Sequence, residues 1–173
     1  MSNFVFVPNF KFWEITNESW TRNNWALSLT KSTSRFPNCI SFKYIFFYSE
    51  KEFTRLIEAP GLFHFSYIVE GELYVNDIQK GLYRLAPERL VLLPGFEALK
   101  GKEIWGMEKL KNGILLATAD DGLFFYENFK LAEWEGSATD YLKKNQTYSM
   151  LRLSDDKFAF GTIQNGLLIS NNA

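Results

Sequence analysis

GLYRL at residues 81–85, GLFFY at residues 122–126 and GLLI at residues 166–169 are three copies of one pattern, a Gly-Leu pair that opens an apolar run. From 81 to 122 and from 122 to 166, the copies are spaced by 41 and 44 residues. Repeats of about 40–50 residues are typical of β-propeller blades. Helical repeats of this length would need long stretches of 3.6-residue periodicity, which the sequence lacks. The repeat therefore indicates an array of β-sheets.

Other features keep a fixed distance from these glycines. The residues eighteen positions upstream begin apolar-rich segments, and they are Phe63, Ile104 and Tyr148. The residues ten positions upstream lie in turn signals suited to tight hairpins, and they are Gly71, Asn112 and Asp156. The segments 89–94 and 130–135 follow as fourth strands. Each unit is thus predicted to contain antiparallel strands A to D, with strand C opened by Gly-Leu.

The predicted units occupy residues 63–103, 104–147 and 148–173. A weaker copy at 25–62 has Lys43 in place of the glycine and Pro37 inside strand B, where a missing N–H is tolerated only at an edge or bulge. We therefore predict one all-β domain or propeller fragment of about four four-stranded blades.

The two ends of the array leave its closure open. The last unit stops where its outer strand D should begin, and the segment 1–24 has no unit of its own. One expectation is that Phe4–Phe12 supplies this strand by pairing with the strand at Gly166, which closes a ring. The other is that open sheet edges pair with a second copy of the chain.

Composition and charge exclude several classes of partner. The 19 basic and 20 acidic residues nearly balance, so no global field favours nucleic acid. The N-terminus has no signal-peptide pattern, and no apolar run reaches about 18 residues. Cys39 is the single cysteine and lies in an apolar stretch, which predicts a buried, inert thiol and no disulfide. We expect no nucleic-acid binding and no membrane insertion by this chain.

Residues that could carry chemistry are few. His64 is the only histidine, so a His-rich metal site is excluded, and packing is its commoner role. The pairs Asp120-Asp121 and Asp155-Asp156 lie in predicted turns and are interpreted as solvated turn residues. The segment Ser137–Asn145 reads as one or two helical turns between blades, opened by a Ser-x-x-Asp capping box. The sequence predicts no catalytic residue, no metal site and no cofactor.

Blade geometry indicates where a ligand would bind. The B–C turns and the D–A connections share one face of a propeller, and the first strands line its central channel. The candidate ligand-binding residues in the turns are Asn76, Asp77, Gln79, Asp120, Asp121, Gln164 and Asn165. The candidates near the channel mouth are His64, Trp105 and Tyr148. Each of these residues also has a structural interpretation, as a turn or packing residue.

The segments 63–85 (FHFSYIVEGELYVNDIQKGLYRL), 90–127 and 141–170 resemble the N-terminal propeller of Bacteroidetes two-component regulator and triple-tyrosine-motif sensor proteins. The resemblance covers about residues 25–170. It implies an extracytoplasmic, periplasmic ligand-sensing module, with a glycan or another small molecule as the ligand. In that family a sandwich domain, a membrane span and a histidine kinase or a DNA-binding domain follow. No stretch of this sequence resembles those parts, and about four blades are fewer than we expect for the family's usual ring.

Two other functions stay open at this point. A propeller enzyme, such as a polysaccharide lyase or a glycosidase, would need clustered carboxylates or a metal at the channel mouth. A truncated propeller could serve only as a scaffold for protein interactions.

Overall fold

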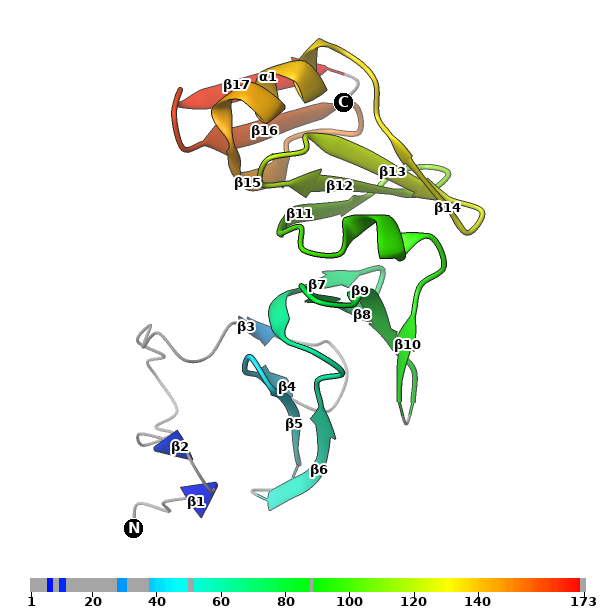
Figure 1. Ribbon diagram of the computed structural model, residues 1–173, viewed down its shortest axis with the longest axis vertical. Helices are drawn as coiled ribbons and strands as arrows, with labels where there is room; N and C mark the ends of the chain where they lie inside the picture. Colours follow the sequence, from blue (N-terminus) through cyan, green and yellow to red (C-terminus); the bar gives the residue numbers. More distant parts are fainter. Residues whose placement is uncertain are drawn as a thin grey trace.

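The computed structural model describes residues 6–7, 10–11, 28–30, 38–49, 52–87 and 89–171. Within these ranges the chain forms a two-stranded sheet of Phe6–Val7 and Phe10–Lys11, followed by four successive antiparallel sheets of three or four strands, each a meander in sequence order. Figure 1 shows these four sheets following one another along the long axis, and in the first three of them the first strand and the fourth strand lie on opposite sides of the view. The predicted all-β propeller-type array is confirmed.

The sheets are named blades 1 to 4. Blade 1 contains β3 (Ser28–Thr30), β4 (Asn38–Ile40), β5 (Tyr44–Ser49) and β6 (Glu52–Glu58). Blade 2 contains β7 (Phe63–Val69), β8 (Glu72–Asp77), β9 (Gly81–Leu85) and β10 (Leu90–Leu92). Blade 3 contains β11 (Ile104–Lys109), β12 (Ile114–Thr118), β13 (Leu123–Glu127) and β14 (Lys130–Glu133). Blade 4 contains β15 (Thr147–Arg152), β16 (Lys157–Thr162) and β17 (Leu167–Asn171).

The weaker fourth copy of the repeat is a blade. Its strands β3 to β6 pair in the predicted order, and β4 begins at Asn38, directly after Pro37. Pro37 itself lies outside the described residues. First strands of consecutive blades contact each other along the array, β3 with β7, β7 with β11 and β11 with β15.

The described part of the chain does not show the predicted closure. Phe6–Val7 (β1) pairs with Phe10–Lys11 (β2), whereas β17 pairs only with β16. Figure 1 places β1 and β2 at the opposite end of the array from β17. Phe4 and Phe12 lie outside the described residues.

Hydrophobic cores form between blades. One cluster joins blades 1 and 2 and includes Ile45 and Phe63. A second joins blades 2 and 3, and a third, with Leu123 and Phe160, joins blades 3 and 4. Blades 2 and 3 pack against a neighbouring blade on both faces. Stability therefore comes from packing between successive units, as in other repeat proteins.

A helix connects blade 2 to blade 3, and another connects blade 3 to blade 4. The 3-10 helix η1 (Phe96–Leu99) buries Phe96 and Leu99 between blades and was not predicted from the sequence. The helix α1 has the predicted bounds, Ser137–Asn145, but the predicted capping box is wrong. Gly136 is the N-cap, and no side chain caps the helix.

Neither helix is long and apolar enough to span a membrane, a finding limited to the described residues.

Both helices pack on the third strand of the preceding blade. A Cβ at Gly81 would lie 2.8 Å from the carbonyl oxygen of Phe96, and one at Gly122 would lie 2.6 Å from Cγ2 of Thr139. Both glycines also have positive φ, +119° and +75°. The Gly-Leu repeat is therefore needed where an inter-blade helix approaches the sheet closely.

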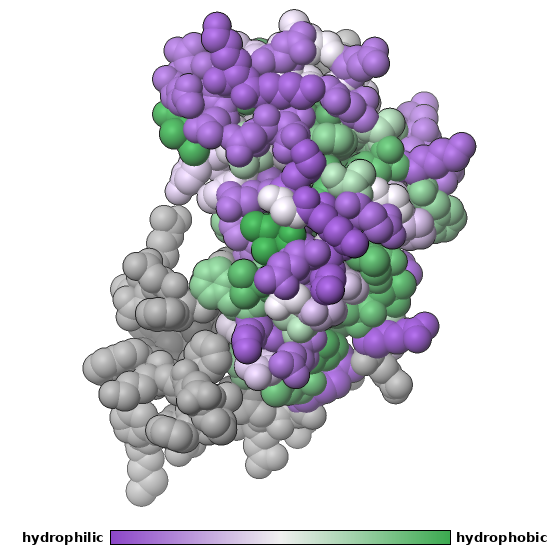
Figure 2. Space-filling view, viewed as in Figure 1, coloured by the Kyte–Doolittle hydropathy of each residue, from purple (hydrophilic) through white to green (hydrophobic). Residues whose placement is uncertain are grey.

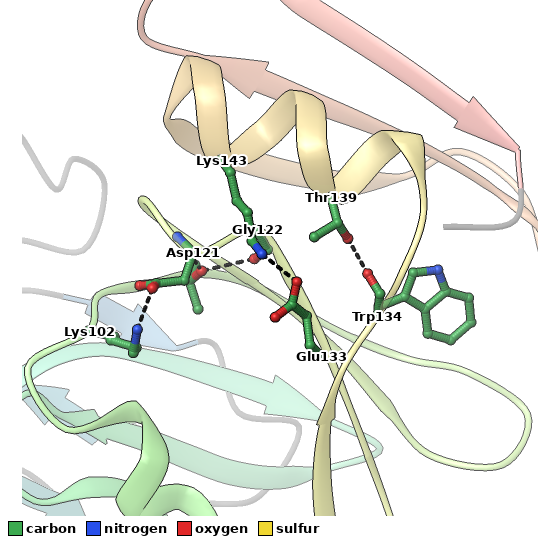
Figure 3. A network of polar contacts seen from close by, with 8 residues as sticks. Lys102, Asp121, Gly122, Glu133, Trp134, Thr139 and Lys143 are labelled. Atoms are coloured by element: carbon green, nitrogen blue, oxygen red, sulfur yellow. Dashed lines mark hydrogen bonds and ion pairs between the residues drawn. The ribbon is translucent and has the colours of Figure 1, made fainter.

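Polar contacts attach α1 to blade 3, as Figure 3 shows. The hydroxyl of Thr139 donates a hydrogen bond to the carbonyl oxygen of Trp134, and Lys143 forms an ion pair with Glu133. On the inner side of the helix, Leu142 is fully buried in the core between blades 3 and 4.

Candidate functional site

A β-bulge interrupts the first strand of blades 2, 3 and 4. In β11 the register skips from Ile104 to Gly106, which leaves Trp105 unpaired. In β15 it skips from Thr147 to Ser149, which leaves Tyr148 unpaired. In blade 2 the interruption is longer: His64 and Phe65 lie between the paired residues Phe63 and Ser66. Bulges bend a strand and redirect its side chains, and they are frequent next to functional sites.

The three bulges bring aromatic rings from three blades together. The Trp105 ring stacks on Tyr148, with 4.9 Å between centroids and 30° between planes. On the other side, Trp105 contacts Phe65 at 4.6 Å and the edge of His64 at 5.6 Å. We call these four residues the aromatic ladder. Tyr148 ends it with a relative exposure of 57%, so a broad aromatic surface is open to a ligand.

This geometry corrects one predicted alignment. The residue of blade 4 equivalent to Phe63 and Ile104 is Thr147, because all three are the buried first residues of their strands. Tyr148 is instead equivalent to Trp105. The offset from Gly166 is therefore nineteen rather than eighteen residues, and the extra residue lies in the turn 154–156 between β15 and β16.

Glu103 connects two members of the aromatic ladder and was not predicted. Its Oε2 accepts a hydrogen bond of 3.0 Å from Nε1 of Trp105, and its Oε1 lies 3.7 Å from Nε2 of His64. The carboxylate therefore fixes the orientation of the indole ring. The sequence does contain a hint of this contact, since a carboxylate two residues before a tryptophan can reach the indole N–H. The direction in which the Trp105 side chain points, however, depends on the bulge.

Burial lowers the pKa of His64 below its ordinary value of 6.5, and the nearby negative charge of Glu103 opposes this shift. The unfolded chain then binds a proton that the folded chain does not, so stability decreases as the pH falls through the unfolded pKa. We expect the urea midpoint to be lower at about pH 5.5 than at about pH 7.5 in the parent chain, and this difference to shrink in His64→Gln. An equal pH dependence in both proteins would contradict the prediction.

The predicted turn residues divide into structural and exposed groups. Asp77 is fully buried, and its carboxylate accepts hydrogen bonds from the backbone N–H groups of Gly61 (2.7 Å), Gln79 (2.9 Å) and Lys80 (3.1 Å). Thr118 plays the same part in blade 3, where its Oγ1 accepts from the N–H of Asp121. Asp77 therefore stabilises a B–C turn and is not available as a ligand-binding group.

The turns of blades 3 and 4 meet in a polar chain centred on Gln146. Its Nε2 donates to Oδ1 of Asp120 at 2.7 Å, and its Oε1 accepts from Nε2 of Gln164 at 3.2 Å. Gln146 lies two residues before Tyr148 and was not among the predicted residues. Two predicted residues, Asp120 and Gln164, are thus brought together by Gln146, which precedes the ladder residue Tyr148 by two positions in the chain.

Four other predicted residues have separate positions. Asp121 forms an ion pair with Lys102 of the connection between blades 2 and 3 (Figure 3). The carbonyl of Asn165 accepts a hydrogen bond from the Tyr141 hydroxyl, and Gln79 is exposed. Asn76 is fully buried across from the bulge of blade 2, and neither atom of its amide has a partner among the described residues.

The polar groups of the site are mostly neutral, and its carboxylates, Glu103 and Asp120, are separate from each other in the hydrogen-bond network. Among the described residues, no group of three or more His, Cys, Asp or Glu side chains is placed to hold a metal ion. The His64 imidazole within the ladder, the Glu103 carboxylate bound to Trp105 and the amides of Gln146 and Gln164 are suited to hydrogen bonding with hydroxyl groups.

These features define a class of protein. Four-stranded antiparallel meanders that pack face to face, with first strands together on one side, are blades of a β-propeller. No protein-family model matches the sequence, and no curated protein matches it either.

Solved structures are similar to this fold. The chain superposes on the extracellular domain of the putative hybrid two component system BT3049 from B. thetaiotaomicron with a TM-score of 0.68, at 16% identity over 90% of this chain. Similar structures include YCF48 bound to D1 peptide (TM-score 0.55, 14% identity, 86% of this chain and 50% of that one). They also include the computationally designed Ika4 protein (TM-score 0.56, 9% identity, 89% of this chain and 100% of that one).

These similarities concern the fold. At identities of 9–16% they show a shared propeller architecture and do not define a ligand. The chain spans 22% of the length of the BT3049 extracellular domain.

Proposed function

We propose that this chain is a non-enzymatic ligand-binding propeller module of the sensor type, which binds a neutral carbohydrate on the aromatic ladder. The observation that carries the proposal is the repeated bulge, which redirects an aromatic residue toward the same place in three successive blades. Core packing alone does not need the Tyr148 ring, which stays more than half exposed.

The chemistry of the ladder favours a sugar ring. A pyranose has an apolar face of C–H groups and a rim of hydroxyl groups, so it needs a flat apolar platform with hydrogen-bonding groups at its edge. Tyr148 provides the platform, stacked on Trp105. Asp120, Gln146 and Gln164, which are joined by hydrogen bonds, offer carboxylate and amide groups, and Gln146 is two residues from Tyr148 in the chain.

The structural similarity supports the proposed sensor role. The BT3049 domain is extracellular in a putative hybrid two component system, and this chain has the same fold at low identity. We propose by analogy that this chain also acts outside the cytoplasm, as the ligand-binding part of a regulatory system. The ladder in that case supplies ligand contacts, while the blades are scaffold.

Binding of neutral oligosaccharides tests this function. Isothermal titration with a panel of cello-, xylo-, manno- and arabino-hexasaccharides is expected to give binding to one or more of them, with quenching of tryptophan fluorescence. Tyr148→Ala and Trp105→Ala are expected to weaken binding about tenfold or more, the equivalent of about 1.4 kcal/mol. Phe129→Ala is the matched control, because Phe129 is 74% exposed but lies in the β13–β14 turn.

Three results would contradict the proposal. One is the absence of binding by any sugar of the panel. The second is equal loss of affinity in Phe129→Ala and in Tyr148→Ala. The third is sugar turnover that disappears in Asp121→Ala, which would indicate a propeller enzyme instead.

A further inference from the structure

The outer face of blade 4, which points away from blade 3, is built like the faces that the preceding blades bury. Phe158 and Phe160 of β16 point into the core shared with blade 3, so Ala159 and Gly161 point to the opposite side. The register adds their cross-strand neighbours to this outer face. Its central part consists of Ser149, Leu151, Ala159, Gly161, Leu167 and Ile169, and Lys157 and Asn171 lie at one end of it.

The leucine of the Gly-Leu repeat shows that this face lacks the neighbouring layer that covers the equivalent face of blades 2 and 3. Leu82 and Leu123 are both 0% exposed, whereas the equivalent Leu167 is 64% exposed. Gly81 and Gly122 are approached closely by η1 and α1, whereas a Cβ at Gly166 would meet nothing within 4 Å. Blade 4 thus presents a surface for packing against another sheet, and no described residue covers it.

Exposed apolar side chains are concentrated in this blade. Of the ten large hydrophobic residues that are exposed in the described part of the chain, six lie between Tyr148 and Ile169. The surface over α1 is by contrast mostly hydrophilic in Figure 2. Contiguous apolar patches of this kind mark interaction sites. The exposed strand β17 also contains no charged residue or proline that would discourage association.

We propose that two copies of this chain associate through the outer face of blade 4, around a two-fold axis. The centre of the face carries no charge, because its six residues are not ionisable, and the one charged residue that alternation adds, Lys157, lies at the end of the strand. It is also uneven in shape: the small residues Ala159 and Gly161 of the central strand lie between Leu151 on one side and Leu167 and Ile169 on the other. When two copies meet, the large side chains of Leu151, Leu167 and Ile169 of each copy can pack over the small residues Ala159 and Gly161 of the other. A contact in which both copies use the same surface is closed by a two-fold axis and gives a dimer.

The other end of the array is less suited to receive this face. Ile45 and Phe47 of β5 point into the core shared with blade 2, so Phe46 points the other way. Phe46 is nevertheless only 2% exposed. Head-to-tail packing of blade 4 on blade 1 would therefore gain no burial from this side chain, whereas blade 4 of a second copy offers uncovered leucine and isoleucine side chains.

Pairs of charged variants test both the association and its symmetry. Light scattering is expected to give the mass of a dimer for the parent chain, and of a monomer for Ile169→Glu and for Ile169→Lys. An equimolar mixture of the two variants is expected to recover the dimer, because opposite charges then meet across the axis. Leu56→Glu is the control: it adds a charge at an exposed aliphatic residue of blade 1 and is expected to stay dimeric. Circular dichroism checks that all variants are folded.

Each other outcome overturns the proposal. A parent chain that is monomeric at its highest soluble concentration has no such contact. A dimer that survives Ile169→Glu uses another surface. Masses that grow beyond two copies, or a mixture that fails to recover the dimer, indicate head-to-tail contacts. None of these variants alters the aromatic ladder, so the result is independent of the proposed sugar binding.

Discussion

Gly122→Ala is expected to lower the free energy of unfolding by about 3 kcal/mol, whereas Gly166→Ala is expected to lower it by only about 1 kcal/mol. The two glycines occupy the same position of the repeat, and their backbones are nearly identical, with φ of +75° and +69°. The strain of a left-handed alanine, about 1–2 kcal/mol, is therefore common to both substitutions.

The difference in unfolding free energy between the two variants measures the cost of the steric clash between a side chain at position 122 and α1. A Cβ at position 122 would lie 2.6 Å from the side chain of Thr139 and 3.0 Å from its backbone oxygen, which cannot move without shifting the helix. Overpacking of this kind costs about 1–3 kcal/mol. A Cβ at position 166 meets nothing within 4 Å.

Urea unfolding followed by circular dichroism measures both values. Gly71→Ala, in an open turn with φ of +78° and no atom near the added methyl group, is a second control for backbone strain alone. Equal losses of stability in Gly122→Ala and Gly166→Ala would mean that the glycine is needed only for its backbone conformation, and that α1 does not crowd a side chain at position 122.

Leu123→Ala is expected to cost about 2–5 kcal/mol of unfolding free energy, and Leu167→Ala less than about 0.5 kcal/mol. Both residues follow the repeat glycine, so their local sequence context is alike. Leu123 is fully buried in the core between blades 3 and 4, where truncation leaves a cavity, whereas water already reaches most of Leu167.

Chemical denaturation at equal, low protein concentration is the measurement, because association through the outer face of blade 4 would add stability to the parent chain. Leu82→Ala is a further check: it is buried between blades 2 and 3 and is expected to resemble Leu123→Ala. Destabilisation by Leu167→Ala as large as by Leu123→Ala, under conditions where the chain is monomeric, would show that blade 4 is covered by the chain itself.

Residues close together in the chain were sufficient to predict the repeat. The Gly-Leu pairs, the hairpin turns near Gly71 and Gly113 and the alternating strands each depend on residues close together in the chain, so their spacing predicted the blades and most strand positions. The same applies to α1, whose bounds match the prediction, although its N-cap does not.

The sequence by itself therefore determined that this protein is an array of four-stranded blades, and roughly where each blade begins. The tertiary structure alone decided which residues meet: the bulges that bring Trp105 to Tyr148, the role of Glu103 between Trp105 and His64, and the burial of Asp77 as a turn residue. The physical reason is that a bulge moves a side chain by one register position without leaving a periodic signal. In the same way, Leu82, Leu123 and Leu167 all follow the repeat glycine, yet the first two are buried and Leu167 is exposed. Burial at this position depends on whether another layer packs on the blade and not on the local sequence.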